Sequence, residues 1–479
     1  MKTFFVMFAL LFSCLTFAQE NNMGVIKGKL IDKETQNPVA GATIQIVGTE
    51  TYAESDNTGE FSFTGLKLET YRLKVTALNF SPIIKSDLVV YASRPLEVVI
   101  ELIPMNVTTE TINVDANYFS KSSDVNISTM NLDFEEIRRA PGATEDISRM
   151  LQTAPGVSIG NDQRNDIIVR GGSPSENLLI IDGIEIPNIN HFNTQGSTSG
   201  AIGFINVKFI QEANIFTGGF PSRFGDKASG VVDIKFREGS RKKFYNDINL
   251  NVGGFGGVFE GPLFSEKGSY LVSVRRSYLE LLKGAIQLSA VPNFWDINLK
   301  VNYDFSPSDK LSMIGFGSID RIDFDGDKTD DLDDPYGKAF SHQNNYVIGF
   351  NYTKIFKKGY LQTTASHSIS DYDIVSWGQR QDTVYFNDKA IEKEYTLKTE
   401  LNYQLSKVLN TNFTIGGKYA DVKNNVFARQ DTTYAGYVRE NLIFDNTINP
   451  YKFFGSFNLT SKFFNDKLIV NSGFRYDYF

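Results

Sequence analysis

Two short apolar runs, each closed by a glycine turn, constrain the fold of this chain more than any other feature. The first run is Ile-Ile-Val-Arg-Gly-Gly at 167–172, and the second is Leu-Leu-Ile-Ile-Asp-Gly at 178–183. Brief runs of branched apolar residues that end at glycine predict short strands closed by tight turns. A segment that reads Leu-Gln-Thr-Ala-Pro-Gly-Val precedes both runs, from residue 151. The region 151–183 therefore indicates a small domain built on short strands.

This order of motifs closely resembles the plug domain of TonB-dependent outer-membrane receptors. The resemblance extends to the segment 218–239, which begins Gly-Gly-Phe-Pro-Ser-Arg-Phe-Gly. In that family this segment is the point where the plug passes into the first barrel strand. The resemblance implies a plug domain at 124–240. The residues that carry the plug motif are Arg170, Gly171, Gly172, Asp182 and Gly183.

Several secondary-structure elements are expected inside the plug. Residues 143–152 have helical spacing with acidic residues early, and Pro155 lies just beyond them, which predicts a helix. Strands are predicted at 167–170, 178–182, 207–210 and 213–216, and a Gly/Ser/Thr-rich loop at 193–203. The plug is therefore expected to be a small α+β domain.

The plug of this family sits in a membrane barrel, and the sequence after residue 240 has the pattern that such a barrel requires. Apolar and polar residues alternate at 298–305, 395–405, 453–463 and 468–478. This alternation places one face of each strand in lipid and the other in water. A soluble antiparallel sandwich has a similar pattern, so alternation alone does not separate the two architectures.

The lengths of the connections favour the barrel. Short turns predicted at 306–309, 357–359, 406–410 and 464–466 alternate with long polar loops predicted at 320–345, 370–393 and 421–449. An outer-membrane barrel has short periplasmic turns and long extracellular loops. Aromatic residues at the predicted strand ends fit the girdles of such a barrel, namely Phe305, Tyr346, Phe356 and Tyr360. We therefore expect a transmembrane antiparallel β-barrel over 241–479.

The number of strands predicts that the barrel is incomplete in this sequence. About ten or eleven strands fit between Phe244 and Phe479, whereas plugged barrels of outer-membrane transporters have about 22. We expect the chain to be truncated within the barrel. The expected fold class is mainly β: an N-terminal β-sandwich, a small α+β plug domain, and the first half of a transmembrane antiparallel β-barrel.

The β-sandwich is predicted by short alternating strands between residues 24 and 103. Turn signals such as Asn37-Pro38 and Asp56-Asn-Thr-Gly59 separate these strands. The segment also resembles the carboxypeptidase regulatory-like domain, at Gly28, at Pro38-Val-Ala-Gly-Ala and at Tyr71-Arg-Leu-Lys-Val. The resemblance implies a structural appendage rather than a peptidase.

A polar linker at 104–123 contains one alternating island, formed by Thr109, Glu110, Thr111, Ile112, Asn113, Val114, Asp115 and Ala116. The island resembles a TonB box, the extended peptide that a periplasmic energy-transducing protein captures by strand addition. Its position just before the plug favours this interpretation. The alternative is an ordinary linker strand. The resemblance implies a TonB-like periplasmic partner.

The N-terminus predicts export from the cytoplasm. A basic residue, an apolar run at 4–15 and the small residue Ala18 indicate a signal peptide at 1–18, cleaved after Ala18. The one cysteine, Cys14, is alternatively an acylation site, although the bulky Phe12 disfavours it. Cleavage leaves a chain without disulfides, and no later run of about 18 apolar residues predicts a membrane helix. We expect an outer-membrane location, with the plug and the N-terminal domain on the periplasmic side.

Composition and motifs give no indication of an enzyme. The formal net charge of -8 disfavours nucleic acid as a partner. His191, His342 and His367 lie far apart, and none opens a zinc motif. We therefore predict no catalytic residues, no metal ligands and no cofactor.

An acidic segment at 320–334 contains 8 aspartates. Calcium prefers clustered carboxylates, but the spacing here differs from that of an EF-hand loop. A solvated extracellular loop is the favoured interpretation, and a calcium site is the alternative.

Three arginines are candidates for contacts between plug and barrel: Arg223, Arg275 and Arg276. Arg275 and Arg276 are adjacent in a predicted strand, so one of them faces the lumen. A simple interfacial charge pair is the alternative.

The family resemblance implies a receptor that imports a nutrient across the outer membrane and contacts outer-membrane lipids. Siderophore, cobalamin, peptide and glycan ligands all remain open. Glycan receptors of this layout pair with a surface lipoprotein, but their plug usually ends Ala-Asn-Gly-Val, whereas this one ends Lys227-Ala-Ser-Gly-Val-Val. That departure puts the lipoprotein partner in doubt. The alternative function is an outer-membrane receptor or surface-assembly barrel that binds or signals without transport.

Overall fold

The computed structural model describes residues 23–105, 129–140, 146–160, 164–251, 254–282, 291–325, 338–377, 384–432, 438–464 and 467–479. The chain forms two compact units, Met1–Ser120 and Lys121–Phe479. The predicted signal peptide at 1–18 and the predicted TonB box at 109–116 lie outside the described residues, as do residues 326–334 of the acidic segment.

The first unit contains two small sheets of short strands. The strands are β1 (Gly24–Asp32), β2 (Thr43–Ile46), β3 (Tyr52–Glu54), β4 (Glu60–Leu66), β5 (Thr70–Thr76), β6 (Ile83–Val89) and β7 (Leu96–Leu102). One sheet has the order β4-β1-β7 and the other β3-β2-β5-β6. Alternate residues point inward, so that Ile26, Leu30, Ile44, Phe61 and Leu73 share one buried core.

The second unit begins with the plug, which is built on one five-stranded sheet. Its elements are β8 (Thr129–Asp133), α2 (Phe134–Arg139), α3 (Ile147–Leu151), β9 (Val157–Ser158), β10 (Ile168–Val169), η1 (Pro174–Glu176), β11 (Asn177–Ile181), β12 (Ile184–Ile186), β13 (Asn190–His191), β14 (Ile202–Gly203), η2 (Val207–Phe209), β15 (Ile210–Phe216) and β16 (Gly230–Phe236). The sheet order is β12-β11-β16-β15-β8. All five residues of β11 are buried, which explains the continuous apolar run at 178–181.

One prediction inside the plug is confirmed in part and another is wrong. The helix predicted at 143–152 is present as α3, which Asp146 caps by accepting a hydrogen bond from the Ser148 N–H at 2.8 Å, and residues 143–145 lie outside the described residues. The predicted strand at 207–210 is instead the 3₁₀ turn η2, and β15 begins at Ile210. Asn206 explains this difference, because its side chain accepts from the Lys208 N–H at 3.0 Å and thereby favours a turn. The helix α2 was not predicted.

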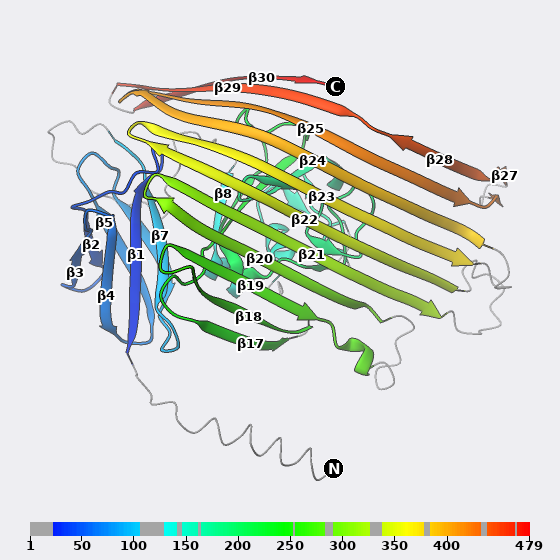
Figure 1. Cartoon of the computed structure of the whole chain (residues 1–479), viewed down its shortest axis with the longest axis horizontal. Coiled ribbons are helices and arrows are strands. Elements are labelled where there is room, and N and C mark those ends of the chain that lie inside the picture. The colour runs from blue at the N-terminus through cyan, green and yellow to red at the C-terminus, as the bar shows by residue number, and fades with distance from the viewer. Residues whose placement is uncertain are drawn as a thin grey trace, which may run out of the picture. The chain divides into compact units, whose positions relative to one another are not determined.

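The rest of the second unit is a long antiparallel sheet, which we call the wall. Its strands are β17 (Tyr245–Asn251), β18 (Gly254–Leu263), β19 (Gly268–Arg276), β20 (Asn293–Ser306), β21 (Asp309–Asp325), β22 (Lys338–Phe356), β23 (Gly359–Trp377), β24 (Val384–Ser406), β25 (Leu409–Ala428), β28 (Leu442–Ile448), β29 (Tyr451–Phe463) and β30 (Leu468–Tyr478). From β17 to β25 each strand lies beside the next one in sequence, β28 and β29 both pair with β25, and β30 pairs with β29. The sheet curves around the plug (Figure 1). Outside the wall sheet, η3 (Leu279–Leu282) follows β19, and β26 (Asp431–Thr432) pairs with β27 (Val438–Arg439).

Strands β28 and β29 act as one strand that is interrupted at 449–450. Both pair with β25, first through 422–428 and then through 409–419. Pro450 lies at the interruption and has no N–H to donate to a ladder. Counted this way, the wall has the ten or eleven strands expected from the sequence. Among the described residues β17 and β30 each have one wall neighbour, so the sheet is open, which is consistent with a truncated barrel.

The predicted long loops are wrong in extent, because the strands continue into them. The short turns at 306–309, 357–359 and 406–410 lie where they were predicted, and most of the turn predicted at 464–466 lies outside the described residues. However, residues 370–377 pair with 384–392 as β-ladder, and 338–345 pair with 318–325. Two neighbouring strands form backbone N–H···O=C hydrogen bonds with each other whatever their side chains are. A polar composition therefore does not end a hairpin. The strands of the wall therefore project well past their apolar section.

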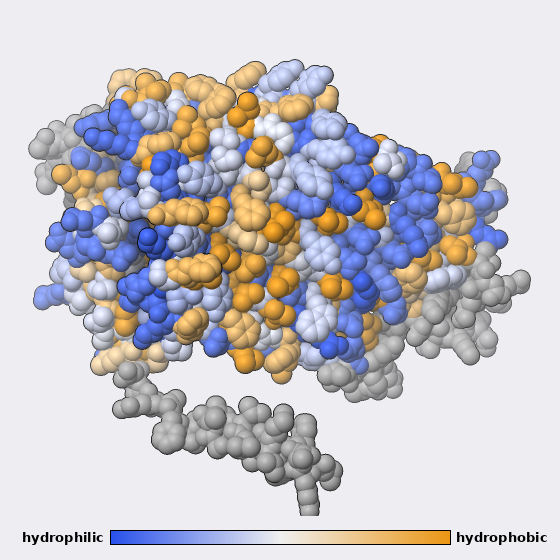
Figure 2. All heavy atoms as spheres, in the orientation of Figure 1, coloured by the Kyte–Doolittle hydropathy of each residue, from blue (hydrophilic) through white to orange (hydrophobic). Residues whose placement is uncertain are grey.

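The wall is polar on its inner face and apolar on its outer face. Along β20 the inward residues Asp296, Asn298 and Lys300 are 3%, 0% and 6% exposed, whereas Trp295 and Ile297 are 45% and 46% exposed. Figure 2 shows apolar side chains gathered over the middle of the wall. A soluble sandwich would bury its apolar face, so this distribution indicates a barrel with lipid outside.

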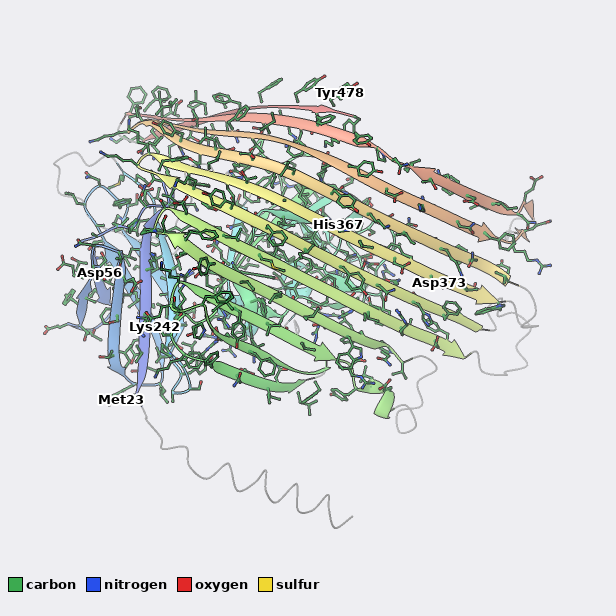
Figure 3. The ribbon with its side chains drawn as sticks, in the orientation of Figure 1. Met23, Asp56, Lys242, His367, Asp373 and Tyr478 are labelled. Carbon is green, nitrogen blue, oxygen red and sulfur yellow. The ribbon has the colours of Figure 1, made fainter. Side chains whose placement is uncertain are left out.

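Aromatic side chains form a row across the outer face. The His367 ring stacks on Tyr395 with centroids 4.1 Å apart, and Tyr419 and Tyr451 continue the row. His367 and Asp373 lie on the same strand, with Asp373 nearer its end (Figure 3). Such a row fits an aromatic girdle.

Of the four girdle residues predicted from sequence, Phe305, Tyr346 and Phe356 are exposed. Tyr360 is the exception. It shares the inward face of β23 with the buried Thr364, because residues four apart in a strand point the same way.

In the described part of the chain, no helix is both long enough and apolar enough to cross a membrane.

Candidate functional site at the contact between plug and wall

The Asp182-Gly183 turn of the plug motif lies against the wall. Both residues have left-handed backbone angles, with φ of 49° and 80°, which glycine adopts without strain. The turn joins β11 to β12. Lys300 Nζ lies 2.9 Å from Asp182 Oδ2, and Asn351 Nδ2 donates to the Asp182 carbonyl at 2.7 Å. The turn is therefore held by two wall strands, β20 and β22.

Lys300 is buried and fully engaged at this contact. Besides Asp182, its ammonium group donates to the Phe236 carbonyl at 2.6 Å. Asp182 Oδ1 in turn accepts from the Phe236 N–H at 3.1 Å. Since a charge taken out of water needs a partner, the lysine fixes the end of β16 and the turn after β11 to the same point of the wall.

Arg170, Gly171 and Gly172 form a turn inside the plug rather than a wall contact. Arg170 and Gly171 have φ of 48° and 79°. A Cβ on Gly172 would lie 1.8 Å from Ser229 Oγ, so only glycine permits this close approach. The Arg170 guanidinium packs against Gly218. The motif therefore packs against both ends of the connection between β15 and β16.

The three candidate arginines have different positions. Arg275 faces the lumen, where its Nε donates to Asp296 Oδ2 at 2.7 Å and its terminal nitrogen donates to the carbonyl of plug residue Gly203 at 2.6 Å. Arg276 points outward, pairs with Glu280 and lies over the Trp295 ring. Arg223 meets the wall through its carbonyl oxygen, which accepts from Arg475 at 3.1 Å.

A buried histidine joins the plug to the wall beside Arg275. His191 Nδ1 lies 2.5 Å from Asp320 Oδ1, and its Nε2 lies 3.1 Å from Asp296 Oδ2. The His191 ring also packs on Phe294, with centroids 4.1 Å apart. Burial opposes the charged form of the histidine, but Asp320 and Asp296 outweigh it and raise the pKa of His191.

Sequence reasoning missed this group. The two aspartates follow the histidine by 105 and 129 residues, so no local motif connects them. One indication of this group was present in the sequence, which is that Asp296 has an inward position in a strand of alternating apolar and polar residues.

A second ionic group ties the plug to the far end of the wall. Lys418 Nζ lies 2.5 Å from Glu185 and 3.4 Å from Asp226, both in the plug. Lys452 pairs with Asp226 as well. Burial raises the pKa of Glu185, but the neighbouring lysine cations outweigh it and hold the pKa below its usual value. Charges of opposite sign therefore meet across the interface at both ends of the plug.

The plug apex and the plug end complete the contact. At the apex Gln195 donates to Glu392 at 2.7 Å and to Asn424 at 2.8 Å. At the end of the plug Arg237 makes two hydrogen bonds to Glu260, at 2.6 and 3.1 Å. Polar contacts thus run along the whole interface.

Apolar contacts also contribute to the interface. Ile184 packs on Gly349 of β22, where an added Cβ would lie 2.2 Å from the isoleucine. A few inward wall residues join the plug core there: Val258, Leu271, Ile314, Phe316 and Val347. Among the residues with described positions, no group of three or more His, Cys, Asp or Glu could hold a metal ion.

A small α+β domain held by ion pairs inside an apolar-surfaced antiparallel wall defines a plugged membrane barrel. Comparison with known proteins agrees with this class. Residues 25–103 match the family model of the carboxypeptidase regulatory-like domain, and residues 121–232 match that of the TonB-dependent receptor plug domain.

Relatives and solved structures point to the same class. The chain is 25% identical over 299 residues to the TonB-dependent transporter Oar of Myxococcus xanthus, a match that covers 54% of this chain and 27% of Oar. Its fold is similar to the siderophore receptor PirA of Acinetobacter baumannii, with 15% identity, a TM-score of 0.53, and coverage of 73% of this chain and 56% of that one. The outer-membrane transporter YddB of Escherichia coli gives 13% identity, a TM-score of 0.51, and coverage of 73% and 56%.

The chain thus spans about a quarter of the curated relative and just over half of these two structures. Its residues 121–232 are similar to the plug domain of TonB-dependent receptors, and a carboxypeptidase regulatory-like domain precedes this segment.

Proposed function

We propose that the full-length gene product imports a nutrient across the outer membrane when a TonB-like periplasmic protein pulls on its N-terminal linker. The observation that carries this proposal is the polar interface between plug and wall. Water can replace each hydrogen bond there when the plug moves, so separation costs little net hydrogen bonding. A continuous apolar seal would instead expose its whole area to water.

The predicted TonB box at 109–116 is well placed for such a pull. The first plug strand after the linker is β8, and β8 is an edge strand that pairs with β15 through residues 129–133. Tension on the linker therefore reaches one short ladder first. The TonB-like protein would bind the box by strand addition, because an extended segment can pair its backbone N–H and C=O groups with the edge of another sheet.

The location proposed for the protein follows from the wall. The exposed apolar residues of the outer face, such as Leu397 and Ile415 at 60% and 56% exposure, contact outer-membrane lipids. The plug and the N-terminal domain are then open to the periplasm. The proposed external ligand is a nutrient of one of four classes: a siderophore, cobalamin, a peptide or a glycan. A surface lipoprotein partner is not required by any contact described above.

The alternative is an outer-membrane receptor or assembly barrel that binds or signals without transport. The separately folded N-terminal sandwich favours it, because such a domain is suited to binding another protein. The two functions differ in whether the linker engages an energy-transducing partner.

The test is co-purification of the full-length gene product with the purified C-terminal domain of TonB. We compare wild type with Ile112→Pro, because proline removes a strand hydrogen bond, and with Ser122→Pro as a matched control outside the box. We expect capture by wild type and Ser122→Pro and loss of capture by Ile112→Pro. Equal capture by all three would reject the box but keep an energy-transducing partner that binds elsewhere. Capture by none would reject the box and favour the non-transporting receptor.

A further inference from the structure

His191 is surrounded by charged groups of the wall. Its two ring nitrogens meet carboxylates on two different strands, Asp296 on β20 and Asp320 on β21. Arg275 on β19 binds Asp296 as well. The side chains of His191, Asp296 and Asp320 are 0%, 1% and 0% exposed. The plug carboxylate Asp146 accepts hydrogen bonds from the N–H of Gly203 and the amide of Asn165, each at 2.8 Å.

The hydrogen bonds require a protonated ring. A neutral imidazole has one N–H donor and one acceptor, and an ionised carboxylate only accepts. Two carboxylates at 2.5 and 3.1 Å are therefore both satisfied only by an imidazolium. The charges agree with this, because an imidazolium and Arg275 together balance Asp296 and Asp320, whereas a neutral ring leaves one negative charge buried without compensation.

The histidine holds a specific part of the plug. It lies in β13, and β13 pairs with β14 through Asn190 with Gly203 and His191 with Ile202. The N–H of the next residue, Phe192, donates to Asp320 Oδ2 at 3.2 Å, and Arg275 donates a hydrogen bond to the carbonyl of Gly203. The same ionic group therefore holds both strands of this plug hairpin.

We propose that His191 is a positioning residue that, as an imidazolium, joins the β13–β14 hairpin of the plug to wall strands β20 and β21, and that loss of its proton releases this hairpin. We call this contact between the hairpin and the wall the joint, and it adds a pH-sensitive element to the proposed import function. The proposal rests on that function only for the reason why the plug would need to move. The joint is complete at a pH below the ordinary histidine value of about 6.5. It persists above that pH because the carboxylates favour the charged form, and it is lost as the pH rises through the raised pKa.

The first test measures the protonation of His191 directly in the detergent-solubilised full-length gene product. Histidine labelled with ¹⁵N gives different shifts for imidazolium and neutral rings, and the signal absent from His191→Gln identifies residue 191. We expect an imidazolium at pH 7.5 in wild type, and a ring that titrates at a lower pH in Asp320→Asn. A neutral ring in wild type at pH 7.5, or an unchanged titration in Asp320→Asn, overturns the proposal.

The second test measures hydrogen exchange of the backbone amides at 188–205. In wild type we expect slow exchange at pH 6 to 7.5 and faster exchange, after correction for the intrinsic rate, once the ring titrates. His191→Gln should exchange on the order of a hundredfold faster at pH 7, as expected when one partner of a buried ionic group is removed. His367→Gln is the matched control, because His367 lies on the outer face of β23 and stacks on Tyr395.

Equal protection of 188–205 in wild type and His191→Gln would reject the joint. If His191→Gln does not fold, the wild-type pH profile and Asp320→Asn still decide the question. Neither measurement involves TonB, so a failure of the joint is distinct from a failure of the import proposal, which the capture experiment tests.

Discussion

Single buried charges contribute, together with the apolar contacts, to the position of the plug. Lys300, Lys418 and His191 each join plug carboxylates or wall carboxylates across the interface. A buried ion pair adds little net stability, but removing one partner is costly because the other charge stays buried. The ion pairs therefore favour one position of the plug over others but add little to the free energy that holds it there.

Replacing Lys300 by methionine tests this at the residue scale. Lys300→Met roughly keeps the length of the side chain but leaves the Asp182 carboxylate without its ammonium partner. We therefore expect the free energy that favours the bound position of the plug to fall by about 3–5 kcal/mol. Protease sensitivity of the plug and thermal unfolding measure the effect. Lys357→Met, in a short turn of the wall, is the control.

The double variant Lys300→Met with Asp182→Asn should recover part of the loss, because it removes the uncompensated charge. If the double variant is as unstable as the sum of the single changes, the two side chains do not interact.

At the scale of elements, sequence patterns predicted turns better than strand ends. Glycine and proline in the short connections determine the local backbone, so the turns at 306–309 and 357–359 were found at their true positions. The end of β23 and the start of β24 were missed, because pairing between neighbours rather than composition extends β23 to residue 377 and β24 back to residue 384. The His191 group was missed for a related reason: it forms only after distant strands meet.

The fit of the plug to the wall at Gly349 gives an element-scale prediction. Gly349→Val places side-chain atoms where Ile184 now packs, since even a Cβ would lie 2.2 Å from the isoleucine. We expect a loss of about 1–3 kcal/mol from overpacking and faster proteolysis of the plug. Gly315→Val is the matched control, because the nearest atom to its added Cβ is 3.8 Å away.

Rescue separates this mechanism from a general weakening of β22. Ile184→Ala combined with Gly349→Val should restore protease resistance. Failure of that rescue, or equal damage from Gly315→Val, would show that Gly349 matters for the strand and not for the plug.

At the scale of the whole molecule, the wall separates two environments along every strand. Thr414 is 2% exposed and faces inward, and its neighbour Ile415 is 56% exposed and faces outward. Alternation of this kind was visible in the sequence, but which face is buried was not. The polar inner face is buried only because the plug fills it, and that required the fold.

Spin labels at these two neighbouring positions test the assignment. The sequence contains 1 cysteine, in the predicted signal peptide, so within residues 19–479 an introduced cysteine is the single thiol available for labelling. In lipid vesicles, a nitroxide at Ile415→Cys should be accessible to oxygen and shielded from a water-soluble nickel reagent. A nitroxide at Thr414→Cys should be shielded from both. Equal exposure to the nickel reagent at both sites would place the outer face in water.

The two-faced strands also bear on how such a chain reaches its membrane. Most outward apolar residues of the wall are followed by an inward polar residue, and the mean hydropathy of the whole sequence is -0.23. A secretion channel that sorts segments by continuous apolar length, of the order of 20 residues for a helix, meets no such segment in the wall strands. The lipid-facing surface comes into existence only when the strands pair, so the chain can pass the inner membrane before it becomes a membrane protein.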